Sequence, residues 1–232
     1  MNKWDYGGAF ERHLNRMRAV YKGKHDALRH PIQTGTAVFD NGSRLKAGSL
    51  FDPLPDFMLR ADCLFVDPPW TQGNMTSFYT KAGLPRPQED YAAFYSRLFE
   101  CVEEIMPKVC YLEIGKDYLA DFIFKMRALY RNVTFYNSSY YHNTKNHCYV
   151  VRGSDHTGKP KLDGMDEEDI IQWVCENEKY ACIGDLCMGR GLVARYAFAA
   201  GKQFCGIELN HKRLSVALEE LDKIGGRYTV ES

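Results

Sequence analysis

The chain has 232 residues and a formal net charge of zero, with 45% hydrophobic and 26% charged residues. This composition is typical of a soluble globular protein, and no apolar run approaches the roughly 20 residues that span a bilayer. No secretory signal peptide is visible, and none of the eight cysteines forms a C-x-x-C pair. We therefore expect a cytoplasmic protein with reduced thiols and no membrane association.

The amino-terminal region is more basic than the rest of the chain. Residues 1–32 hold seven Lys or Arg against three acidic residues. The pattern over residues 10–21 predicts a short basic helix, and residues 36–43 predict a strand and a turn at Asn41-Gly42. We interpret residues 1–45 as a basic segment that could contact nucleic-acid phosphate, and residues 46–232 as one further domain.

A short apolar run over residues 61–66 is typical of a buried strand, and Asp67-Pro68-Pro69-Trp70 follows it directly. Prolines have a fixed φ and no amide donor, so this pair stiffens the loop and presents carbonyl acceptors. These residue types suit the binding of an exocyclic amine of a nucleic-acid base. Asp67 and the carbonyl of Pro68 would accept its hydrogens, and Trp70 would stack on the ring with about 1–3 kcal/mol.

Helices and strands alternate after this motif. Residues 71–87, rich in Gly, Thr, Asn and Pro, are predicted to be a loop. The elements expected beyond it are, in chain order, a helix over 88–106, a strand over 108–114, a helix over 117–130, antiparallel strands over 133–140 and 148–152, a polar connector over 153–164, a helix over 166–177, a strand over 181–185, a helix over 191–200, a strand over 203–208 and a helix over 210–224. This alternation predicts an α/β fold with a mostly parallel sheet, an antiparallel hairpin and helices on both faces.

Metal-binding residue types gather near the hairpin. His142, His147 and Cys148 lie on both sides of the turn expected over residues 143–146. Because that turn separates them, we expect no metal site.

A second conspicuous segment joins a predicted strand to a predicted helix. It runs from Asp185 to Gly191 and carries Gly189 and Gly191, which allow a tight turn and close approach of a ligand to the backbone. Glu208 ends the next strand, where an acid can accept hydrogen bonds from both ribose hydroxyls of a nucleoside cofactor. The spacing differs from G-x-G-x-x-G, which favours a cofactor without a pyrophosphate.

Together these segments resemble the DNA amino-methyltransferases that use S-adenosylmethionine. The catalytic motif of that family is matched by Asp67-Pro68-Pro69-Trp70, and its Asp form is typical of adenine N6 methylation. The cofactor motif follows the catalytic motif, as in the β group of the family. Further similar segments are Gly48-Ser49-Leu50, His156-Thr157-Gly158-Lys159-Pro160 and Gly206-Ile207-Glu208-Leu209-Asn210.

The resemblance implies a Rossmann-like methyltransferase fold, S-adenosylmethionine as cofactor and DNA as partner. It implies that residues 46–232 form one catalytic domain without a sizeable target-recognition domain, acting as a monomer or homodimer. The catalytic residues would be Asp67, Pro68, Pro69 and Trp70. The residues implied to bind the cofactor are Asp185, Leu186, Cys187, Gly189, Gly191, Glu208, Asn210 and Lys159, the last for the cofactor carboxylate.

Three alternatives stay open. The acceptor could be an RNA adenosine or the N4 amine of cytosine in DNA. The chain could instead be a catalytically silent subunit that binds nucleic acid, although such a subunit has no need of Asp67. The small size of the chain suggests that a phage or prophage encodes it.

Overall fold

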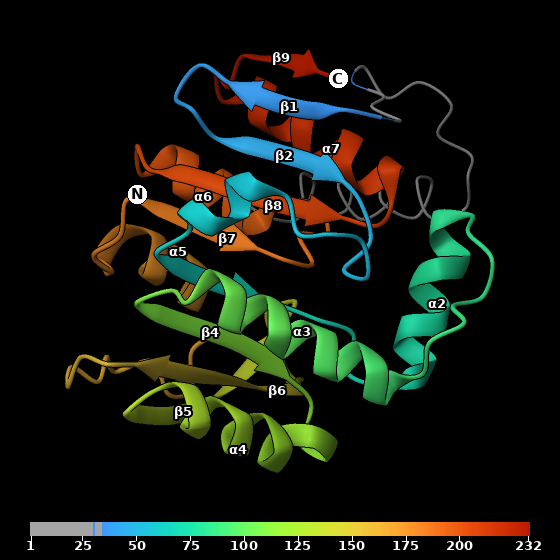
Figure 1. The fold of residues 1–232 in the computed structure, drawn as a ribbon. Coiled ribbons are helices and arrows are strands. Elements are labelled where there is room, and N and C mark those ends of the chain that lie inside the picture. Colours follow the sequence, from blue (N-terminus) through green and yellow to red (C-terminus); the bar gives the residue numbers. More distant parts are fainter. Residues whose placement is uncertain (1–29, 31–33) are drawn as a thin grey trace.

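The computed structural model describes His30 and residues 34–232 (Figure 1). These residues form a nine-stranded sheet in the order β5-β6-β4-β3-β7-β8-β2-β1-β9. The neighbouring strands from β4 to β2 are parallel, and the strands at both edges pair antiparallel. The strands are β1 (Thr36–Phe39), β2 (Arg44–Ala47), β3 (Cys63–Val66), β4 (Val109–Ile114), β5 (Asn132–Tyr140), β6 (Asn143–Ser154), β7 (Cys182–Asp185), β8 (Gln203–Glu208) and β9 (Tyr228–Glu231).

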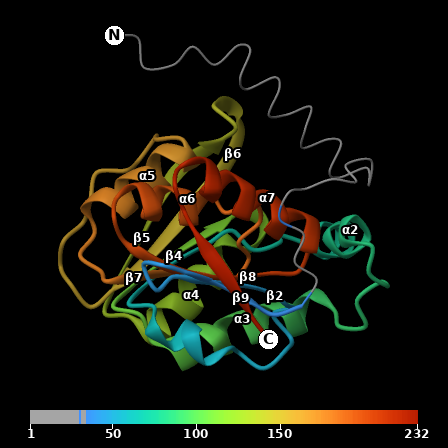
Figure 2. The same ribbon diagram turned by 90° about the horizontal axis from the view of Figure 1, so that it is seen from above.

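Helices cover both faces of this sheet, which confirms the predicted α/β architecture (Figure 2). Helices α5, α6 and α7 lie on one face, and η1, α3 and α4 lie on the other. The helices are η1 (Asp56–Arg60), α2 (Gln72–Ala82), α3 (Tyr91–Ile105), η2 (Lys116–Tyr118), α4 (Leu119–Leu129), α5 (Glu167–Asn177), α6 (Leu192–Ala199) and α7 (His211–Lys223). Within the described ranges, no helix has the length and apolarity needed to cross a membrane.

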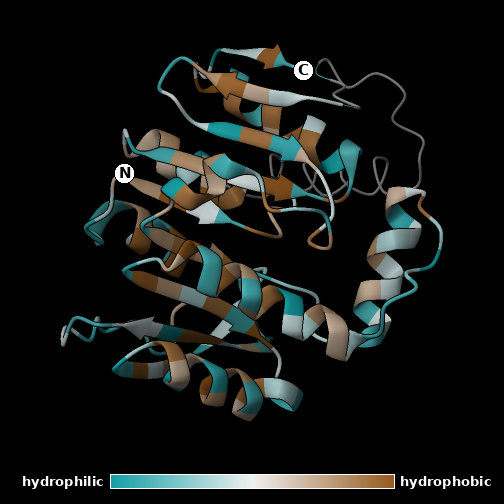
Figure 3. Ribbon diagram, in the orientation of Figure 1, coloured by the Kyte–Doolittle hydropathy of each residue, from teal (hydrophilic) through white to brown (hydrophobic). Residues whose placement is uncertain are grey.

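The side chains of the central strands alternate between two hydrophobic clusters. In β3, Cys63 and Phe65 pack toward α5–α7, whereas Leu64 and Val66 pack toward η1, α3 and α4. Because both faces of the sheet are covered at its centre, β3 is apolar and buried at every position, whereas β2, nearer the edge of the sheet, contains hydrophilic residues (Figure 3). Polar residues that follow the central strands therefore lie at the edge of the sheet, where the apolar core ends.

Residues 72–82 form helix α2, so the prediction of a loop there is wrong. The side chain of Thr71 accepts a hydrogen bond from the amide of Asn74 at 3.2 Å and caps the helix. Gly83 ends it with a φ of 75°. Caps of this kind stabilise a helix even where its interior holds Gly, Thr and Asn. Helix α2 stands beyond the carboxyl ends of the parallel strands (Figure 1).

The hairpin turn also differs from the prediction. Tyr141 and His142 form the turn with φ values of 59° and 49°, and β6 begins at Asn143. The expected turn over residues 143–146 is therefore part of a strand. A register shift near Ser139 and Tyr140 takes up the extra residues of β6.

The expected domain boundary at residue 45 is wrong, because it falls inside β2. Strand β2 pairs in parallel with β8, and β1 lies between β2 and β9. Strands β2 and β9 were not anticipated; each has four residues and includes charged ones, Arg44 and Lys46 in β2 and Glu231 in β9. The basic helix expected over residues 10–21 lies outside the described residues.

Candidate active site

A cavity of about 870 Å³ opens at the carboxyl ends of β3, β7 and β8. Parallel strands end at the same edge of a sheet, so segments that are far apart in the sequence meet there. Ten of the twelve predicted site residues fall in the two segments that follow these strands or at the end of β8. Those that line the cavity are Asp67, Pro68, Pro69, Trp70, Asp185, Leu186, Cys187, Gly189 and Glu208.

Asp67 and Trp70 form a fixed unit on the cavity wall. The indole nitrogen Nε1 of Trp70 donates a hydrogen bond of 3.1 Å to Oδ1 of Asp67. The Trp70 ring meets Tyr140 edge-on, with ring centroids 5.5 Å apart. On another side it packs on Gly115, where an added Cβ would come within 2.9 Å of the indole. Glycine at position 115 thus allows the ring to lie against the end of β4.

The surroundings of Asp67 raise the pKa of its carboxyl to about 6. The main cause is loss of bulk water, which the hydrogen bond from Trp70 and the charge of Arg213 partly oppose. The Asp67 side chain is nevertheless accessible from the cavity. We attribute the raised pKa to enclosure by the cavity walls rather than to burial in the apolar core. The carboxyl can therefore reach a ligand and still be ionised at neutral pH.

The segment from Asp185 to Gly191 forms a tight turn at the start of α6. Oδ1 of Asp185 accepts a hydrogen bond of 3.0 Å from the amide of Cys187. Gly189 and Gly191 have φ values of 58° and 72°, which side chains rarely adopt. An added Cβ at Gly191 would lie 2.7 Å from Cβ of Ala217 in α7. Gly191 does not line the cavity but allows α6 and α7 to pack closely beneath the turn.

Glu208 connects this turn with the start of α7. Its Oε2 accepts a hydrogen bond of 2.6 Å from the amide of Gly189, and its Oε1 accepts one of 2.9 Å from the amide of Asn210. Burial raises the pKa of the Glu208 carboxyl, while Arg213 and the two amides oppose the rise. A carboxylate has about four acceptor positions, so two amide contacts leave capacity for a bound diol.

Asn210 supports the site from behind the cavity wall. Its Oδ1 accepts a hydrogen bond of 2.9 Å from the amide of Lys212 and caps α7. Its Nδ2 donates to the carbonyl of Lys81 in α2 at 3.2 Å. Asn210 therefore joins α7 to α2 rather than facing the cavity.

Lys159 is not part of this site, so its predicted role is wrong. It lines a separate cavity of about 410 Å³ together with Arg127, Arg131 and three neighbouring residues. The reason is the direction of β6, which runs antiparallel to β4. Its carboxyl end, and the segment that follows, lie at the opposite edge of the sheet from Asp67.

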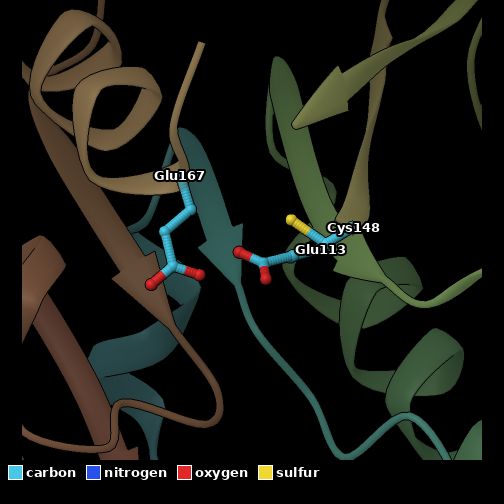
Figure 4. A group of neighbouring side chains, drawn as sticks. All are labelled: Glu113, Cys148 and Glu167. Atoms are coloured by element: carbon cyan, nitrogen blue, oxygen red, sulfur yellow. The ribbon is translucent and has the colours of Figure 1, made fainter. Parts of the chain in front are cut away.

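The cavity is also lined by four acidic residues that the sequence analysis did not single out, and two of them, Glu113 and Glu167, lie close together. Glu113 lies near the end of β4 and is only 1% exposed, and Glu167 opens α5. Figure 4 shows their carboxyl groups facing each other, with the sulfur of Cys148 beside Glu113. In the sequence, Glu113 could have been recognised as a candidate because it is the one acidic residue in an otherwise apolar strand.

The hairpin tip overhangs the same cavity. Tyr140, Tyr141 and His142 all line it, and the Tyr141 side chain is 57% exposed. His142 lies between the carboxyl groups of Asp166 and Glu168, at 3.5 Å and 3.3 Å. These contacts fix the tip over the start of α5. The Tyr140 ring lies beside Trp70, and the Tyr141 ring lies beside Tyr140.

Comparisons with known proteins show the fold. No family model matches the sequence, and no curated protein matches it. Among solved structures, M1.HpyAVI in complex with SAM has a TM-score of 0.55 at 9% identity, over 77% of this chain and 98% of that one. A candidate DNA modification methylase from Thermus thermophilus, complexed with S-adenosyl-L-methionine, has a TM-score of 0.56 at 13% identity, over 80% and 96%. The cytosine-N4-specific PvuII DNA methyltransferase has a TM-score of 0.55 at 8% identity, over 82% and 94%. This chain therefore has the fold of these methyltransferase structures.

Proposed function

We propose that this protein transfers the methyl group of S-adenosylmethionine to the exocyclic N6 amine of adenine in DNA. One observation carries the proposal: Asp67 and Trp70 share a single cavity with the glycine turn and Glu208. A group that can hold an amine and a base thus faces a turn that suits a nucleoside. The fold shared with methyltransferase structures, two of them bound to the same cofactor, supports this assignment.

The residues present fit that cofactor. At Gly189 an added Cβ would meet only the carbonyl oxygen of Cys187, at 3.9 Å, so the turn leaves open space on the cavity side. Glu208 is 5% exposed and offers carboxylate acceptors to the two ribose hydroxyls. Leu186, Met188 and Val193 give the same wall an apolar part for an adenine ring.

The chain contributes acceptors, orientation and exclusion of water. When bound, S-adenosylmethionine supplies a sulfonium methyl group as the electrophile. Asp67 and the carbonyl of Pro68 accept hydrogen bonds from the amine of the base, which concentrates its lone pair on nitrogen. Trp70 stacks on the base with about 1–3 kcal/mol, and Tyr140 supports the indole edge-on. Asp67 takes the proton that the amine loses after transfer, which a carboxyl with a pKa near 6 can do.

In duplex DNA the target base must leave the helix to reach this cavity. Tyr141, exposed at the hairpin tip beside the cavity, is placed to meet the strands around such a base. We assign the activity to the cytosol, since all eight cysteines are free thiols.

Cytosine N4 is the second candidate for the acceptor. The cytosine-N4-specific PvuII enzyme shares the fold to a similar degree as the other neighbours. Adenine is favoured by the Asp form of the motif at position 67, which in the similar family is typical of adenine N6 methylation.

The test is to incubate the purified protein with methyl-labelled S-adenosylmethionine in two separate reactions, one with DNA and one with RNA. Digestion and mass spectrometry then identify the modified nucleoside. N6-methyldeoxyadenosine from DNA is the expected product. N4-methyldeoxycytidine would assign the second candidate, and label only in RNA would overturn the choice of DNA. No label in either, with the cofactor bound, would indicate a catalytically silent subunit.

A further inference from the structure

Asp67 lies between two groups of acids along the edge of the sheet. The strand order places β3 between β7 and β4. On the β7 and β8 side lie Asp185, whose carboxyl holds the glycine turn through the amide of Cys187, and Glu208, which the proposed function assigns to the cofactor. On the β4 side lies Glu113, one residue beyond the paired positions Val66 and Leu112. If the cofactor lies on the β7 and β8 side of Asp67, the base that accepts the methyl group lies on the β4 side.

Several groups on that side are already suited to a base. Trp70 packs on Gly115, which directly follows β4, and Tyr140 of β5 meets the indole edge-on. Glu113 and Glu167 face the same part of the cavity from β4 and α5 (Figure 4). The proposed function does not use either acid.

Glu113 and Glu167 form a close pair with an unsatisfied atom. One carboxyl oxygen of Glu113, one of Glu167 and the sulfur of Cys148 all lie within 4.8 Å of one another. Glu113 is 1% exposed, and its Oε1 is buried without a hydrogen bond of ordinary geometry among the described residues, although Glu167 and Cys148 are close enough to act on the pKa of this carboxyl through hydrogen bonds. A buried polar atom that borders a cavity and lacks a partner points to a ligand that completes it.

Two close carboxyl groups beside a third acid cannot all be ionised in an enclosed site. Burial, and then the charge of Asp67, raise the pKa of Glu113, and the same two causes raise the pKa of Glu167 to about 8. Neutral carboxylic acids carry O–H donors, whereas ionised Asp67 only accepts. The Glu113–Glu167 pair can therefore offer donors to a ligand, whereas Asp67 offers acceptors.

We infer that Glu113, held by Glu167, recognises the acceptor base by donating a hydrogen bond to the ring nitrogen bonded to the same carbon as the methylated amine. The inference rests on the proposed function and adds a residue that selects the base. In adenine this ring nitrogen is N1, and in cytosine it is N3. Asp67 and Glu113 would together read the amine and the acceptor nitrogen beside it.

This arrangement defines the substrate class. Adenine and cytosine both present an amine next to a ring acceptor. The amine carbon of guanine is bonded to two ring nitrogens, the N–H at N1 on the pairing edge and the acceptor N3 beside the sugar, so the Glu113 donor would meet another donor at N1. A site whose buried polar group is left unpaired rejects such a ligand strongly. The Glu113–Glu167 pair therefore disfavours guanine bound by its N1 edge, and it does not by itself separate adenine from cytosine.

The test uses oligonucleotides in which the target adenine is replaced by 1-deazaadenine, which lacks N1, or by 3-deazaadenine as the matched control. If cytosine is the target, 3-deazacytosine takes the place of 1-deazaadenine. We expect the wild-type protein to prefer adenine over 1-deazaadenine about tenfold in kcat/KM and in Kd, the size of one donated hydrogen bond. The 3-deazaadenine substrate should behave like adenine.

Variants of Glu113 assign the preference to this residue. Glu113→Gln keeps an N–H donor and should keep the preference for adenine. Glu113→Leu removes the donor and should abolish the preference, which mere loss of structure would not do selectively. The wild-type comparison needs no variant, so the inference stays testable even if Glu113→Leu does not fold.

Three other results would contradict this inference, the proposed function or both. Equal use of adenine and 1-deazaadenine by the wild-type protein would overturn this inference and leave the proposed function intact. Absence of transfer to every oligonucleotide would overturn the proposed function, and this inference with it. Activity lost with EDTA and recovered with Zn²⁺ would also overturn the inference, because a metal held by the pair would keep both carboxyls ionised.

Discussion

The indole nitrogen of Trp70 donates a hydrogen bond of 3.1 Å to Oδ1 of Asp67, three residues earlier in the chain. This contact favours the ionised form of Asp67 and opposes the effect of enclosure on its pKa. It also fixes the plane of the indole relative to the carboxyl. The group that holds the amine and the surface that holds the base are therefore oriented by one hydrogen bond.

Replacement of Asp67 should separate catalysis from cofactor binding. In Asp67→Ala, the amine loses a carboxylate acceptor, and we expect methyl transfer to fall by a factor of about 10²–10⁴. The Kd for S-adenosylmethionine, measured by calorimetry, should change little because the glycine turn and Glu208 remain. Asp56→Ala, an exposed acid in η1, is the matched control. Full activity in Asp67→Ala would falsify the proposed role of the carboxyl.

The activity should depend on pH through Asp67. With a pKa of about 6, the carboxyl protonates below that pH and loses acceptor capacity, so kcat/KM should fall on the acidic side. The charge of Arg213 lowers this pKa. In Arg213→Gln the acidic limb should therefore move to higher pH, and in Arg213→Lys it should return toward the wild-type position. An acidic limb at the same pH in all three proteins would contradict this assignment.

The candidate site was largely predictable because its signals are local. Asp67, Asp185 and Glu208 each end or follow an apolar strand, and parallel strands bring such positions to one edge. The prediction for Lys159 is wrong because the position of this residue depends on the direction of β6, which no local sequence pattern indicates. Helix α2 was not predicted because the Gly, Thr, Asn and Pro content of this segment indicated a loop. The cap at Thr71 and the end at Gly83 were the local signals for a helix. The partnership of Glu113 with Glu167 depends on how α5 packs on the sheet, which only the fold shows.

A variant of Lys159 tests whether this residue lies outside the cofactor site. Because it lines the smaller cavity with Arg127 and Arg131, Lys159→Ala should leave the Kd for S-adenosylmethionine within about twofold of the wild-type value. The comparison is Glu208→Gln, in which one acceptor for the ribose hydroxyls becomes an amide and binding should weaken clearly. Tenfold weaker binding in Lys159→Ala would show that the lysine reaches the cofactor.

Gly191 and Gly201 form a matched pair of glycines with similar backbone conformation. Their φ values are 72° and 69°, so alanine at either position carries similar backbone strain. Only at Gly191 would the new Cβ clash, since it would lie 2.7 Å from Cβ of Ala217, while nothing lies within 4 Å at Gly201. We expect Gly191→Ala to lower the free energy of unfolding by about 1–3 kcal/mol more than Gly201→Ala, and to weaken cofactor binding. Urea unfolding of both variants measures the difference, and equal losses would argue against the close packing of α6 on α7.

The stability of the protein should reveal the protonated Glu113–Glu167 pair even without a substrate. The pKa of Glu167 rises from about 4.5 to about 8 on folding, so the folded protein binds a proton that the unfolded chain releases in this interval. The stabilisation is complete below pH 4.5 and is lost as the pH rises toward 8. Glu167→Gln has no such proton, so its stability should fall less than that of the wild-type protein between pH 5 and pH 8. Asp169→Asn, an exposed position in the same helical turn, should follow the wild-type curve. Urea midpoints at several pH values provide the measurement, and parallel curves for Glu167→Gln and the wild-type protein would mean that Glu167 is already ionised in the folded state.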